Sequence, residues 1–168
     1  MKFKLIFLKT TIVFFLIISS LTQAGADEKK QEPTNIRADS MKVVQNENIT
    51  IFSGNVNVVK GKTIIDCEKL IVHHKNSDSV NSTPDRNSFK SIEAKGKVRI
   101  QMEDKRAKAE NAIFNSDKEI LILTGGRPEI IDSGNKISGD SITYFIKTGI
   151  MEVEKNSDSQ VEATFINE

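Results

Sequence analysis

A short pattern that occurs four times along the chain constrains its fold more than any other feature. Each copy reads small residue, acid, polar residue, apolar residue, any residue, apolar residue. The copies span residues 38–43, 67–72, 109–114 and 139–144, and their acids are 29, 42 and 30 residues apart. A period of roughly 20–50 residues is typical of folds built from stacked supersecondary units, which bury a core only together.

A second motif, centred on glycine, alternates with the first. Residues 52–58 align with residues 94–100, and residues 123–130 follow the same pattern with one residue inserted. Between the motifs, apolar and polar residues alternate in short stretches rich in Ile, Val and Thr, which is typical of half-buried strands. Residues 107–114 have the best helix propensity, but the repeat assigns them to a strand.

The phase of the apolar residues changes at each repeat acid. Ile65 and Cys67 precede Glu68 by three and one residues, whereas Leu70 and Val72 follow it by two and four. A regular strand would place these two pairs on opposite faces. We therefore expect a bulge at each acid that inverts the phase, and a glycine with the same role at the opposite corner. The pattern predicts a long, open, two-sheet β-structure around one apolar seam.

The first 26 residues have the features of a cleavable secretory signal. Residues 1–9 carry three lysines and no acid, residues 10–21 are apolar or small, and small residues at 24 and 26 suit a cut after Ala26. The apolar run is shorter than the roughly 20 residues that span a bilayer. We expect a signal at 1–26, a mobile leader at 27–33, a β-domain at 34–155 with a surface loop at 75–88, and a C-terminal edge strand and tail at 156–168.

Composition excludes several classes of function. Removal of residues 1–26 leaves 21 basic and 23 acidic side chains, a net charge of −2, which argues against nucleic-acid binding. Cys67 is the only cysteine, so no intramolecular disulfide forms, and we expect a buried, inert thiol. His73 and His74 would lie on opposite faces of a strand, a poor geometry for one metal ion. We predict no metal site, no cofactor and no enzymatic activity, with the repeat acids serving the corners.

These motifs resemble the repeats of the LptA/OstA-like family of periplasmic lipopolysaccharide-transport proteins. The resemblance is carried by residues 36–39, 52–56, 64–70, 121–126 and 137–144. It implies an all-β fold, an open, slightly twisted antiparallel β-jellyroll. It also implies a bridge between inner and outer membranes that shields the lipid A acyl chains of lipopolysaccharide in a groove. The implied partners are further copies joined end to end, an inner-membrane LptC-like component and an outer-membrane LptD-like component.

A lipid A carrier needs an apolar groove, because each exposed methylene costs about 0.8 kcal/mol in water. The inward-facing candidates in this chain are mostly aliphatic, with few aromatic rings to fill the middle. The same positions suit a plain packed core, and the pattern alone does not separate the two uses. We predict that the groove is lined by Ile36, Met41, Val43, Ile51, Val56, Val58, Leu70, Val72, Val98, Ile100, Phe114, Ile122, Ile142 and Tyr144.

Two other functions remain open on the sequence. One is a membrane-anchored, LptC-like relative that keeps residues 1–26, and the other is a structural β-solenoid with a packed interior that binds no lipid. Residues 34–38 and 151–165 are the predicted sheet edges, which would suit pairing with a partner strand. The basic residues within 105–108 are interpreted as a solvated strand face, with contact to lipid phosphates as the alternative.

Overall fold

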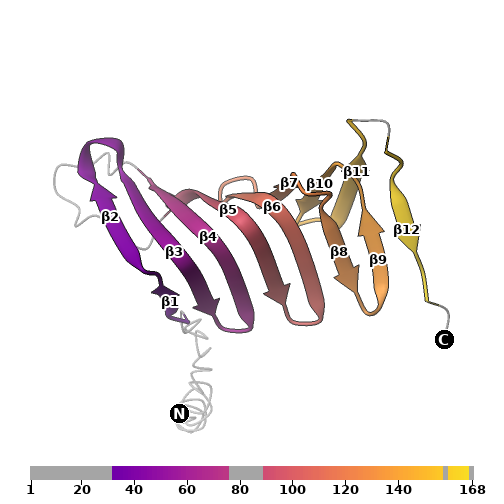
Figure 1. Ribbon diagram of the computed structural model, residues 1–168, viewed down its shortest axis with the longest axis horizontal. Helices are drawn as coiled ribbons and strands as arrows, with labels where there is room; N and C mark the ends of the chain where they lie inside the picture. Colours follow the sequence, from indigo (N-terminus) through magenta and orange to yellow (C-terminus); the bar gives the residue numbers. More distant parts are fainter. Residues whose placement is uncertain (1–31, 76–88, 157–158, 167–168) are drawn as a thin grey trace, which may run out of the picture. The chain divides into compact units, whose positions relative to one another are not determined.

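A computed structural model of the chain describes residues 32–75, 89–156 and 159–166. In this part of the chain, twelve strands form one antiparallel sheet, and the only helical element is the 3-10 turn Gln45–Glu47. The strands are β1 (Thr34–Arg37), β2 (Ser40–Val44), β3 (Ile49–Lys60), β4 (Thr63–His74), β5 (Phe89–Met102), β6 (Lys105–Asn115), β7 (Ile120–Thr124), β8 (Glu129–Asp132), β9 (Asn135–Ser138), β10 (Ser141–Phe145), β11 (Ile150–Glu154) and β12 (Glu162–Thr164) (Figure 1).

The described residues test some of the sequence-based expectations and leave others outside their range. The predicted signal segment and residues 76–88 of the predicted loop lie outside the described residues. The segment 107–114, the best helix former, is confirmed as a strand because it forms most of β6. Within the described ranges, no helix has the length and apolar character that crossing a membrane requires.

The chain passes back and forth between two halves of the sheet, which we call leaf 1 and leaf 2. Leaf 1 contains β1, β8, β9 and β12, leaf 2 contains β2, β7, β10 and β11, and β3 to β6 run through both. Successive passes pair antiparallel in sequence order. The sheet therefore stays open, with β1 and β2 at one edge and β11 and β12 at the other (Figure 1). The predicted edges are confirmed, and β2 is an additional edge strand.

Each continuous pass bends at a corner between the two leaves, where the strand register shifts. The shift lies across Gly54 in β3, across Glu68 in β4 and across Gly96 in β5. The predicted phase inversion is confirmed at Glu68, because the apolar residues before and after the corner of β4 lie in the core cluster or pack against it. At Asp39 and Asp140 the strand ends and a new one begins, so the expected bulge is replaced there by a break. A bulge at the corner thus turns two strand faces of opposite parity toward the same seam.

The corner glycines lie beside the repeat acids rather than at an opposite corner, which corrects the sequence-based expectation. A Cβ added to Gly54 would lie 2.3 Å from Oδ2 of Asp39, and one added to Gly96 would lie 2.5 Å from Oε2 of Glu68. The backbone N–H of Asp39 also donates to the carbonyl oxygen of Gly54 at 2.9 Å. Asp39, Glu68 and Glu110 each cover a glycine of the next pass, so the acid and glycine motifs form one corner together. Asp140 differs, because its backbone N–H donates to the carbonyl oxygen of Glu154 instead.

The inner faces of the two leaves meet in a single apolar core. Fifteen buried apolar side chains contribute to it, and among the most deeply buried are Val56 and Val98 from leaf 1 with Leu123 and Ile142 from leaf 2. Within the described residues, no buried side-chain polar atom lacks a hydrogen-bond partner. The core cluster is therefore built from apolar side chains, and the buried polar side chains have hydrogen-bond partners.

We predict that Gly96→Ala destabilises the protein through both its backbone conformation and its contact with Glu68. Gly96 has a φ of +79°, and the new Cβ would meet the Cβ of Glu68 at 2.9 Å, a point that no rotamer change relieves. The positive φ costs about 1 kcal/mol and the overlap adds about 1–3 kcal/mol. Urea denaturation should show a loss of about 2–4 kcal/mol in the free energy of unfolding.

Gly149→Ala is the matched control for this prediction. Gly149 has a φ of +70° and nothing within 4 Å of its added Cβ, so only the backbone cost applies. We expect a loss of about 1 kcal/mol. Equal losses at the two positions would contradict the role of the acid–glycine contact.

Candidate functional site

The candidate site is the seam between the two leaves, on the side opposite the corners. On that side the passes end in turns, such as residues 60–63, 102–105 and 132–135 of leaf 1. Among the described strands, each backbone pairing joins segments of the same leaf. The strands β3 to β6 continue from one leaf to the other through the corner. The leaves are therefore joined by backbone at the corner and held elsewhere by side-chain packing.

Most residues that the sequence analysis assigned to a groove reach this seam. The fully buried ones are Val56, Val58, Leu70, Val72, Val98, Ile100 and Ile142. The ones that are partly buried and pack against this core are Ile36, Phe114 and Tyr144. Both leaves contribute, so the structure brings together residues that are up to about a hundred positions apart in the chain.

Met41 and Val43 face the same side as the seam but stay exposed. Met41 pairs with Phe52, which pairs in turn with the buried Leu70, so strand alternation puts Met41 and Val43 on the inner face. They lie on the edge strand β2, and their exposed fractions are 63% and 55%. The inner face of the sheet thus ends in an uncovered apolar margin.

The structure does not bring Ile51 and Ile122 into the seam. Ile122 lies between the buried Leu121 and Leu123, so alternation turns it to the outer face, and its register partner Ile113 is also exposed. Both Ile51 and Ile122 lie three residues before a corner glycine, whereas the inner positions lie two and four residues before it. The sequence analysis chose Ile122 and so missed Leu121 and Leu123, which lie four and two residues before Gly125. This spacing from the glycine is the sequence signal that identifies them.

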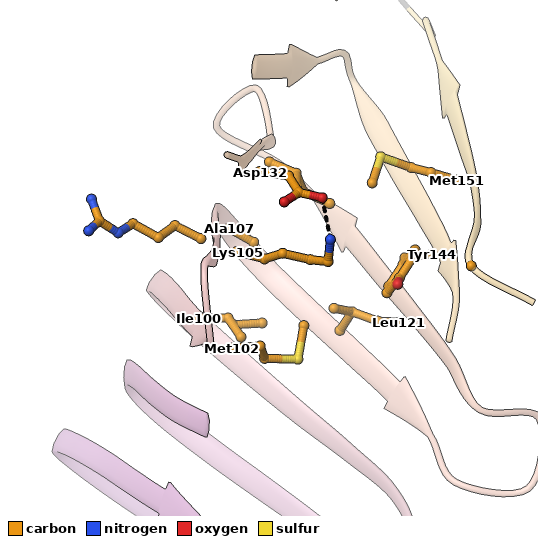
Figure 2. A pocket seen from close by; sticks show the side chains of 11 residues that line it. Ile100, Met102, Lys105, Ala107, Leu121, Asp132, Tyr144 and Met151 are labelled. Atoms are coloured by element: carbon orange, nitrogen blue, oxygen red, sulfur yellow. Dashed lines mark hydrogen bonds and ion pairs between the residues drawn. The ribbon is translucent and has the colours of Figure 1, made fainter. Parts of the chain in front are cut away.

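A cavity of about 100 Å³ opens between the leaves near β10 and β11. Figure 2 shows side chains from both leaves directed toward it. Its walls are mainly apolar, and include Ile100, Met102 and Ala107 of leaf 1 with Leu121, Tyr144 and Met151 of leaf 2. At this cavity the packing between the two leaves is incomplete.

An ion pair stands at the wall of this cavity. The ammonium of Lys105 donates a hydrogen bond to the Asp132 carboxylate, and both residues line the cavity (Figure 2). That hydrogen bond raises the pKa of Lys105 above its ordinary value and lowers the pKa of Asp132 below its own. Both groups are therefore charged at neutral pH, at the edge of an otherwise apolar space.

The two histidines of β4 have structural partners on opposite faces of the sheet. Nε2 of His73 lies 3.0 Å from Oε1 of Glu93 on β5, whereas Nε2 of His74 lies 2.9 Å from the hydroxyl of Thr50 on β3. The two rings therefore hydrogen-bond to different neighbouring strands. In the described part of the chain, no group of three His, Cys, Asp or Glu side chains is placed to hold a metal ion.

Comparisons with known proteins give a consistent result. The family described as "LptA/(LptD N-terminal domain) LPS transport protein" matches residues 35–150. The lipopolysaccharide export system protein LptA of Escherichia coli K12 is 25% identical over 175 residues, which cover 99% of this chain and 89% of that protein. LptA of Haemophilus influenzae is 23% identical over 97% of this chain and 91% of its own length.

A solved structure supports the fold. The crystal structure of LptH, described as the LptA-homologous periplasmic component of the lipopolysaccharide transport device of Pseudomonas aeruginosa, superposes with a TM-score of 0.68. The two chains are 13% identical, and the superposition covers 81% of this chain and 96% of LptH. The predicted open antiparallel β-jellyroll is confirmed by this likeness together with the open sheet described above.

We predict that the thiol of Cys67 is unreactive in the folded protein. Cys67 is 6% exposed at the corner of β4, and burial raises its pKa from 9.0 to about 11. At pH 8 the thiolate fraction is therefore roughly a hundredfold lower than for a thiol with a pKa of 9.0. Alkylation slows accordingly, because thiolate is the reacting form. Alkylation followed by mass spectrometry should be at least a hundredfold slower in buffer than in urea. A native rate equal to the rate in urea would show an open corner.

Proposed function

The chain belongs to the LptA/(LptD N-terminal domain) family of lipopolysaccharide-transport proteins, and on that premise we propose that it carries lipopolysaccharide through the periplasm with the lipid A acyl chains between its two leaves. Relatives named as lipopolysaccharide export proteins support this role. The proposed role is to hold and pass on the lipid without covalent chemistry, after removal of the signal at residues 1–26.

The feature that best supports a carrier is the one-sided connection of the leaves. Their inner faces are apolar, and in the described residues the backbone joins them on the corner side, through the bulges of β3 to β6 and through the links from β1 to β2, β7 to β8 and β9 to β10. Separating the opposite rims therefore breaks no pairing between strands. Acyl chains that enter from the rims would replace side-chain contacts across the seam with contacts of the same chemistry.

The size of the existing cavity sets a condition on loading. At about 100 Å³ it is smaller than the roughly 150 Å³ cavity that accommodates one benzene molecule. An acyl chain of a dozen methylenes needs more space than this, so the leaves must move apart as it enters. Each buried methylene contributes about 0.8 kcal/mol toward that opening.

We place the joints of the bridge at the two sheet edges. β1 and β2 at one edge and β11 and β12 at the other have unpaired backbone, and Met41 and Val43 extend the apolar inner face up to the first edge. Pairing of β1 and β2 with β11 and β12 of the next copy would cover this margin and continue the seam. LptC-like and LptD-like components would use the same edges at the inner- and outer-membrane ends.

A packed structural sheet that binds no lipid is the second candidate. It is favoured by one observation, the closed packing of most of the seam around residues such as Leu123 and Ile142, which are 1% and 0% exposed. The two candidates differ in whether lipid ever reaches these side chains.

The carrier proposal predicts lipid contact at Phe114 but not at its neighbour Ile113. Phe114 packs at the seam, whereas Ile113 lies on the outer face of the same strand with 42% of its surface exposed. A photo-crosslinking residue at each position in living cells should give a lipopolysaccharide adduct at Phe114 alone. Both variants are checked for export and folding. An adduct at neither site, or at Ile113 as strongly as at Phe114, would favour the packed structural sheet.

The bridge proposal predicts that Val43→Asp weakens self-association, whereas Lys42→Asp does not. Both residues lie on β2, and Val43 faces the seam side while Lys42 faces out. A charge at Val43 would be buried without a partner at the joint, at a cost of several kcal/mol, but it stays solvated in the single chain. Sedimentation over a wide concentration range should show assembly for wild type and Lys42→Asp only. A wild type that stays monomeric throughout would contradict the end-to-end joint.

A further inference from the structure

Strand alternation separates the basic residues at 105–108, which look like one cluster in the sequence. Lys105 shares the parity of Ala107 and Ala109, both buried in the core, so its stem turns toward the cavity. Lys108 lies on the opposite face, where its ammonium contacts Glu129 at 3.0 Å. The interpretation of this segment as a solvated strand face is therefore correct for Lys108 and wrong for Lys105.

Lys105 occupies the rim of leaf 1, where the seam opens. It is the first residue of β6, directly after the turn from β5, and its register partners are Met102 and Asp132. Its side chain is 41% exposed, so the ammonium reaches water while the stem lines the apolar cavity. Figure 2 shows the ammonium above a space bordered by Leu121 and Tyr144 of leaf 2. A cation at the mouth of an apolar cavity is complementary to an anionic head on an apolar chain.

We infer that Lys105 binds the phosphate group of the amphiphile whose acyl chain occupies the cavity below. This inference rests on the proposed carrier function and assigns the headgroup contact within it. An ammonium has three donor hydrogens, and Asp132 accepts one, so two remain for phosphate oxygens. Asp132 holds the ammonium at the rim before the lipid arrives, and its own negative charge opposes the incoming anion.

The position of Lys105 fixes how deep the lipid lies. The phosphate stays at the rim, where water and Lys105 share its charge, and the chain extends between Ile100 and Leu121 toward the core. An uncharged head on the same chain would gain the apolar contacts but not the charge-assisted hydrogen bond. Lys105 therefore discriminates by headgroup and not by chain length.

The test measures binding of dodecyl phosphate and dodecyl maltoside, below their micelle concentrations, to the full mature chain by isothermal titration calorimetry. Lys105→Met keeps the length and apolarity of the stem and removes the charge. It should weaken dodecyl phosphate binding roughly tenfold, as for a lost charge-assisted hydrogen bond, and leave dodecyl maltoside binding unchanged. Lys108→Met, on the outer face of the same strand, should change neither. Asp132→Asn should leave phosphate binding equal or tighter, because it removes the competing carboxylate.

The outcomes separate this inference from the carrier proposal. Equal binding of both amphiphiles that Lys105→Met does not alter would overturn the headgroup contact and keep the carrier. Binding of neither amphiphile would count against the carrier itself. Inorganic phosphate that binds alone, in a manner that depends on Lys105, would assign the site to free phosphate and overturn the amphiphile. A loss in Asp132→Asn as large as in Lys105→Met, with equal loss of melting temperature, would reduce the pair to a structural role.

Discussion

The contact between a repeat acid and the glycine of the next pass is the constraint on which the rest of this structure depends. At the corner, Glu68 covers Gly96 and the strand register shifts across both residues. The shift lets apolar residues of opposite parity face one seam, so a single chain supplies both walls of the core. Without it, one leaf would turn its apolar face to water and the core would have only one wall.

The same corner makes the molecule asymmetric across its width. One side of the seam is closed by continuous backbone, whereas the other is closed by packed side chains. In the proposed carrier, the polar rim residues, including Lys105 and Asp132, are where a lipid head would meet water. Two apolar walls that are joined by backbone along one side both follow from bending a single sheet.

The sequence predicted the strands, the open edges and the phase inversion, because the repeat states the spacing of apolar residues from each acid directly. The sequence analysis placed the glycines at the wrong corner, because two interleaved motifs can lie at the same corner or at opposite ones. The register between neighbouring strands determines which arrangement forms. The selection of Ile122 in place of Leu121 and Leu123 was a slip of one residue in an unbroken aliphatic run, where alternation gives no signal. How closely the leaves pack, and that Asp132 lies beside Lys105, depend on contacts between distant passes that no local pattern encodes.

A sheet that grows by whole acid–glycine repeats keeps two dimensions independent. The number of residues on either side of a corner sets the width of the seam, whereas the number of repeats sets its length. Since neighbouring strands lie about 4.8 Å apart, one added repeat of two passes would extend the seam by about 10 Å and leave its cross-section unchanged. Duplication of a repeat therefore lengthens the seam without changing its cross-section. The length of such a protein can evolve separately from the size of the molecule that fits between its leaves.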